Sequence, residues 1–159
     1  MIAVIACGNL ARCDDGAGPA VLERLRAHPQ LRQREDIRLH DAATDGMAVM
    51  YQARGARALH LIDASRSGAP AGTLSVVPGA EFEAQREPPR DSHALRWDDA
   101  LTIGRRLYRQ EFPREVQVYL IEAQNLGLGL ELSPPVRAAV EKLAVHLAET
   151  LCATEPAAC

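Results

Sequence analysis

The chain has 159 residues, a formal net charge of −3 and an apolar share of 47%. This size and composition are typical of one stable domain that needs no disulfides. The mild acidity argues against a protein that binds nucleic acid through a basic surface. No apolar run approaches the roughly 20 residues of a membrane helix. Met1 leads directly into an apolar run without a basic leader, and the four cysteines form no CxxC pair. We therefore expect a cytoplasmic protein with reduced thiols and no membrane or nucleic-acid partner.

The first element is a short, continuously apolar run over residues 2–6. Such a run predicts a strand that is buried on both faces of a parallel sheet. A loop over residues 8–18 follows, and helical spacing begins after it. We expect Asp14 or Asp15 to cap this helix, because a carboxylate accepts hydrogen bonds from the free N–H groups of a first helical turn.

Two more strands are predicted at residues 36–40 and 58–62, and they end at Asp41 and Asp63. Further along, the pattern predicts a short strand at residues 73–77, a helix at 92–108, a buried strand at 115–121 and a last helix that starts at Ser133. Strands that alternate with helices predict a three-layer α/β/α sandwich around a mostly parallel, twisted sheet. We expect one domain over residues 1–152 and a disordered tail over 153–159.

Polar groups follow three of the predicted strands, and right-handed crossovers bring such strand ends to one edge of a parallel sheet. Asp15, Asp41 and Asp63 can therefore meet there, together with His93 at the start of a helix. Two carboxylates and an imidazole can bind a divalent metal or form an acid–base pair. Each residue also has a plainer interpretation, as a helix cap, a turn residue or a surface histidine.

Other candidate sites have weaker support in the sequence. The loop 8–18 lacks both phosphate-binding glycine motifs, and its two aspartates would repel a phosphate. Ser65 and Ser92 lie in no GxSxG elbow. Cys7 and Cys13 have no sequence partner that would activate a thiol. We expect Asp98 and Asp99 to lie on a solvated helix face.

Five segments, in the same order along the chain, resemble signature segments of the [NiFe]-hydrogenase maturation endopeptidases. Residues 6–18, ACGNLARCDDGAG, resemble the signature GxGNxLxxDDGxG, and residues 41–47, DAATDGM, resemble the turn DGGTxGM. The third is a strand end with the letters IDA, at residues 61–64. The fourth is a helix start with the pattern SHxL followed by AL, at residues 92–101, and the fifth is the beginning of the last helix, at residues 132–136.

The resemblance implies a three-layer α/β/α endopeptidase that removes a C-terminal extension from the precursor of a hydrogenase large subunit. It further implies that the cut follows nickel insertion and that the substrate carries the nickel, so that the enzyme has no permanent cofactor. Family metal-contacting positions correspond to Asp15, Asp63 and His93, and Asp41 lies in the turn beside them. We expect a monomer that has the large-subunit precursor as its partner.

Three small residues depart from the family pattern. Ala6 replaces the first glycine of the signature, and Ala42 and Ala43 replace two turn glycines. Alanine resists positive φ, so the turn can follow a different path, which leaves the role of Asp41 open. Two alternatives stay open as well. One is a chaperone that binds the hydrogenase precursor without cutting it, and the other is a hydrolase similar to peptidyl-tRNA hydrolase.

Overall fold

The computed structural model describes residues 1–83 and 95–155. A five-stranded sheet with the order β2-β1-β3-β5-β4 forms its centre. Four strands are parallel, and the edge strand β4 runs antiparallel to β5. The strands are β1 (Ile2–Cys7), β2 (Ile37–Ala43), β3 (Ala58–Ser65), β4 (Leu74–Pro78) and β5 (Glu115–Glu122).

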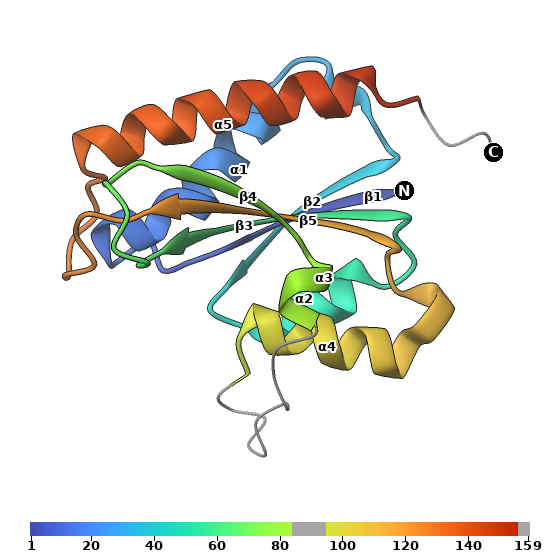
Figure 1. Ribbon diagram of the computed structural model, residues 1–159. Coiled ribbons are helices and arrows are strands. Elements are labelled where there is room, and N and C mark those ends of the chain that lie inside the picture. Colours follow the sequence, from blue (N-terminus) through green and yellow to red (C-terminus); the bar gives the residue numbers. More distant parts are fainter. Residues whose placement is uncertain (84–94, 156–159) are drawn as a thin grey trace.

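Helices cover both faces of this sheet, as Figure 1 shows. One face carries α1 (Ala17–Ala27) and α5 (Pro134–Ala153), and the other carries α2 (Gly46–Ala53), α3 (Ala80–Glu83) and α4 (Trp97–Tyr108). Every residue of β1 is buried, because its alternate side chains enter the two different core layers. The predicted three-layer α/β/α architecture is confirmed. Single 3-10 turns are η1 (Cys13–Gly16), η2 (Leu31–Gln33) and η4 (Arg109–Glu111).

The last helix follows the predicted pattern closely. Ser133 is its N-cap residue, and Pro134 opens its first turn, where the missing N–H costs nothing. The apolar stripe of α5 is fully buried against α1 and the sheet, at Val136, Val140, Leu143, Leu147 and Leu151. None of the helices within residues 1–83 and 95–155 is long and apolar enough to cross a membrane.

Helix α1 lies close to the carboxyl ends of the strands because Gly18 has no side chain. A Cβ at Gly18 would lie 2.3 Å from the Cys7 carbonyl oxygen and 2.9 Å from the Ile62 carbonyl oxygen. Gly8, with a φ of +133°, reverses the chain after β1, and a Cβ there would lie 1.9 Å from the carbonyl oxygen of Asp15. These two glycines therefore fold the loop 8–18 against the strand ends.

Several element bounds differ from the predicted ones. Strand β2 continues through Asp41 to Ala43 with an irregularity in its register against β1, and β3 continues through Asp63 to Ser65. In the sequence, the small residues that follow Asp41 and Asp63 are typical of a turn. In the structure, Ala43, Ala64 and Ser65 instead pair with residues of a neighbouring strand, so both strands continue. Helix α4 begins at Trp97, and the earlier start predicted at Ser92 lies outside the described residues.

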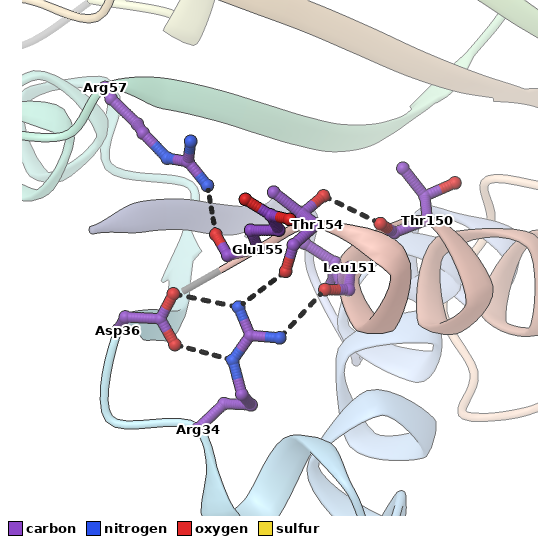
Figure 2. A network of polar contacts seen from close by, with 7 residues as sticks. All are labelled: Arg34, Asp36, Arg57, Thr150, Leu151, Thr154 and Glu155. Carbon is purple, nitrogen blue, oxygen red and sulfur yellow. Dashed lines mark hydrogen bonds and ion pairs between the residues drawn. The ribbon is translucent and has the colours of Figure 1, made fainter. Parts of the chain in front are cut away.

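A polar cluster attaches the end of α5 to the start of β2, as Figure 2 shows. The Arg34 guanidinium donates two hydrogen bonds to Asp36, at 2.6 and 2.8 Å, and two more to the carbonyl oxygens of Leu151 and Thr154. Arg57 donates to the carbonyl oxygen of Glu155. The chain is thus held to its neighbours as far as Glu155, where the described residues end.

Candidate active site

Three of the four predicted site residues gather at the carboxyl edge of the sheet. The ladder places Asp41 opposite Ala6 and places Asp63 one residue beyond Ile62, which is also opposite Ala6. Asp15 lies in η1 and is close enough to Asp63 for the two carboxylates to repel each other. The fourth residue, His93, lies outside the described residues.

Asp63 is the most constrained carboxylate of the group. Its Oδ1 accepts a hydrogen bond from the N–H of Ala64 at 2.8 Å, and its Oδ2 accepts one from the indole N–H of Trp97 at 2.6 Å. Burial raises the pKa of Asp63 to about 6, and repulsion by Asp15 acts in the same direction, while the two hydrogen bonds and Arg96 act against it. Asp63 therefore changes protonation state close to neutral pH.

Trp97 is a site residue that the sequence reasoning missed. It begins α4, is 7% exposed and packs edge-on against the ring of Phe82. It is also the only tryptophan in the chain, in a protein with 4% aromatic residues. The sequence did contain a signal for this residue, since the single tryptophan follows the predicted site histidine by four residues. A buried indole N–H needs an acceptor, and a nearby carboxylate can supply one.

Asp15 faces open space beside Asp63. Its Oδ2 accepts a hydrogen bond from the N–H of Asn9 at 2.8 Å, and the Asn9 side chain in turn accepts one from the N–H of Ala11. The loop 8–18 thus fixes the carboxylate through its own backbone. Asp15 lines two neighbouring clefts, of about 440 and 520 Å³.

Asp14 has a structural role that differs from the predicted helix cap. Helix α1 has Gly16 as its N-cap residue and no side-chain cap. The fully buried Asp14 instead accepts hydrogen bonds from the N–H groups of Gln124, Asn125 and Ser133 and from the Ser133 hydroxyl. Burial alone would raise the pKa of Asp14, but these four bonds outweigh it and lower the pKa.

Asp41 shapes the backbone next to the site. Its Oδ1 accepts a hydrogen bond from the N–H of Ala43 at 2.9 Å, which closes a local turn at the end of β2. Ala43 has a φ of +48° there, in a region that glycine occupies more easily. The carbonyl oxygen of Ala43 then accepts a bond from the N–H of Gly8. Asp41 thereby connects β2 to the loop that carries Asp15.

Cys7 lies among these carboxylates and is 6% exposed. Burial raises the pKa of its thiol far above the usual range, and the charges of Asp63, Asp41 and Asp15 raise it further. The thiol is therefore neutral at physiological pH and is a poor nucleophile, since the thiolate is the reactive form.

The donors that could hold a metal are Asp15 and Asp63. Within residues 1–83 and 95–155, no group of three histidine, cysteine or acidic side chains is arranged to hold a metal ion. The predicted set of Asp15, Asp63 and His93 includes one residue outside these ranges, so the described pair offers two carboxylates at one edge of the sheet.

Comparison with known proteins shows the family of this chain. The family model of hydrogenase maturation proteases, HycI, matches residues 19–150. The hydrogenase expression/formation protein HupM of Azotobacter chroococcum mcd 1 is 31% identical over 150 residues, which cover 92% of this chain and 70% of that protein. The chain belongs to the hydrogenase maturation protease family.

Solved structures share the fold of this maturation protease. The hydrogenase maturating endopeptidase HybD from E. coli is 23% identical and has a TM-score of 0.75, over 94% of this chain and 91% of that one. The [NiFe]-hydrogenase maturation protease HybD from Thermococcus kodakarensis is 27% identical, with a TM-score of 0.71 over 95% and 98%. As a member of this family, the chain is a hydrolase that acts in hydrogenase maturation.

Two further carboxylates of this maturation protease are buried. Asp99, expected on a solvated face, is 5% exposed, and its carboxylate accepts a hydrogen bond from the N–H of Arg96 at the start of α4. Glu122, which no motif singled out, is 3% exposed at the end of β5. Its carboxylate accepts bonds from the Ser65 hydroxyl, the Ser67 hydroxyl and N–H, and the N–H of Gly68.

Proposed function

We propose that this chain is an endopeptidase that removes the C-terminal extension of a [NiFe]-hydrogenase large-subunit precursor after nickel has been inserted. The observation that supports this most is the pair of carboxylates Asp15 and Asp63, held by separate hydrogen bonds at the carboxyl edge of the sheet. In a member of the maturation protease family, such a pair suits recognition of a metal on the substrate.

Each residue of the site has a distinct part in this proposal. Trp97 and the Ala64 N–H orient the Asp63 carboxylate, and the Asn9 N–H orients that of Asp15. The two negative charges repel each other, and a cation between them relieves that repulsion. We assign the third contact to His93. The nickel held by the precursor would then position the scissile bond and polarise its carbonyl group.

This arrangement makes cleavage depend on the metal content of the substrate. Two carboxylates and one imidazole leave a metal short of a complete ligand set, so the remaining ligands come from the precursor. A precursor without nickel lacks the cation that the carboxylates attract. It therefore docks weakly, and its extension stays in place.

The test compares nickel-loaded with nickel-free precursor, incubated with the purified enzyme. We expect shortening of the loaded precursor alone, measured by mass spectrometry of the large subunit. Equal cleavage of both forms would refute metal recognition. Full activity of Asp15→Ala or His93→Ala would refute the site, and Arg106→Gln, an exposed change on α4, is the matched control.

A chaperone that binds the precursor without cutting it is the second candidate, because Ala42 and Ala43 stand where the family pattern beside Asp41 has two glycines. The same mass measurement separates the two functions, since only an enzyme leaves a shortened chain. Family membership favours the enzyme, and it gives no support to a hydrolase similar to peptidyl-tRNA hydrolase. We further propose that the enzyme works as a monomer in the cytoplasm.

A further inference from the structure

Arg12 and Arg66 line the larger of the two clefts beside Asp15. The cleft has a volume of about 520 Å³, and its other wall is formed by residues 123–127. Among residues 1–83 and 95–155, its charged lining residues are these two arginines and Asp15. This described lining has one positive charge in excess, although the whole chain has a net charge of −3.

Arg66 is placed by a loop that is organised around a buried charge. The loop 65–68 begins at the last residue of β3. Four of its N–H and O–H groups donate hydrogen bonds to the Glu122 carboxylate, at 2.8 to 3.0 Å. Burial on its own would raise the pKa of Glu122, but the bonds from Ser67, Ser65 and Gly68 hold it at about 2. Glu122 is therefore an anion throughout the physiological pH range, and its hydrogen bonds to the loop 65–68 do not depend on pH there.

Arg12 is held by contacts with a different loop, residues 126–129. Its Nε donates a hydrogen bond to the carbonyl oxygen of Leu126 at 3.2 Å, and its backbone pairs with Gly129. Within the part of the chain that the structure describes, its terminal guanidinium nitrogens donate to no other group. Among residues 1–83 and 95–155, no carboxylate lies within ion-pair distance of either Arg12 or Arg66. Two guanidinium groups thus border the same cleft with unused donors.

We propose that Arg12 and Arg66 bind an aspartate or glutamate side chain of the substrate, close to the bond that is cut. This inference rests on the proposed peptidase function and adds a determinant of its specificity. A guanidinium fork matches the two oxygens of a carboxylate. One carboxylate neutralises the single excess charge of the cleft, whereas a phosphate dianion would place additional negative charge beside Asp15.

The experiment measures binding of two short peptides to the full chain. The probes are N-acetyl-Ala-Ala-Glu-Ala-Ala-amide and the same peptide with Gln in place of Glu. Their dissociation constants are determined by NMR titration of the arginine Nε–H signals at 50 mM salt. We expect about fivefold tighter binding of the Glu peptide, which matches an exposed ion pair, and loss of this preference in Arg12→Gln and Arg66→Gln.

Arg106→Gln is the control variant, because Arg106 is exposed on α4 and does not line the cleft. It must keep the preference for the Glu peptide. Equal binding of the two peptides by the unaltered chain, or an equal loss of preference in Arg106→Gln, would overturn the proposal. Stronger competition by inorganic phosphate than by acetate would assign the cleft to phosphate groups instead.

This measurement involves no bond cleavage, so its outcome is separate from that of the peptidase assay. If the precursor is cut and the peptides bind equally, the peptidase function stands and the role of the arginines fails. If the Glu peptide binds selectively and the precursor stays intact, the arginines bind carboxylates in a protein that does not cut its partner.

Discussion

Among single residues, Asp63 has the clearest consequence for pH dependence. Burial raises its pKa from 3.8 to about 6 in the folded protein, so the native state binds more protons than the unfolded state between these values. The stability that this group contributes is therefore present at low pH and is lost as the pH rises through 6. The unaltered chain should therefore lose stability relative to Asp63→Asn as the pH rises. We expect the difference between their free energies of unfolding to shift by about 1 kcal/mol in favour of Asp63→Asn from pH 5 to pH 8, measured by urea unfolding.

The variant Trp97→Phe checks the cause of this behaviour. It removes the indole N–H that favours the charged form of Asp63, so the pKa of Asp63 should rise above 6. Carbon-13 NMR of the carboxyl group measures this directly. An unchanged or lowered titration midpoint in Trp97→Phe would contradict the role given to the indole.

The neighbours Asp14 and Asp15 separate structural from functional effects. Asp14→Ala leaves four donors without their acceptor in a fully buried place, and we expect a loss of about 3 kcal/mol in the free energy of unfolding. Asp15→Ala removes one accepted bond, and we expect a loss of about 1 kcal/mol. Urea unfolding at pH 7 compares them, and equal losses would be inconsistent with this division.

At the scale of elements, the end of β2 stores strain in one residue. Ala43 has a φ of +48°, which costs an alanine about 1 kcal/mol that glycine avoids. We expect Ala43→Gly to raise the melting temperature and to add about 0.5 kcal/mol of stability. Ala42→Gly is the control, since Ala42 is buried without a positive φ, and it should destabilise the protein. A loss of stability in Ala43→Gly would show that the turn carries no strain.

The elements also show which features can be derived from sequence. The apolar run of β1 and the stripe of α5 predicted the layers correctly, because burial periodicity is a local signal. The bonds of Asp14 were not predicted and Glu122 was not singled out, because their partners lie up to 119 and 57 residues away along the chain. A carboxylate that precedes a helix, such as Asp14, has the same local pattern whether it caps that helix or binds a distant loop. Sequence therefore predicted the edge of the sheet at which Asp15, Asp41 and Asp63 lie, but not the contacts that hold these side chains.

For the molecule as a whole, Arg34 joins the start of β2 to the end of α5 (Figure 2). Lysine keeps the charge but cannot bond to two carboxylate oxygens and two carbonyl groups at once. We expect Arg34→Lys to cost about 1–2 kcal/mol and to speed hydrogen exchange in the last turn of α5. Arg32→Lys, an exposed change one turn away, should cost less than about 0.5 kcal/mol. Similar effects of the two changes would rule out a special role for Arg34.

The bonds of Asp14 also join two parts of the chain that are synthesised at different times. Asp14 and the adjacent Asp15 are made early, whereas Ser133, which supplies two of the four bonds to Asp14, leaves the ribosome more than a hundred residues later. The loop that presents Asp15 lacks these supports until then. We therefore expect the loop 8–18 to take its final shape only after the start of α5 has emerged from the ribosome.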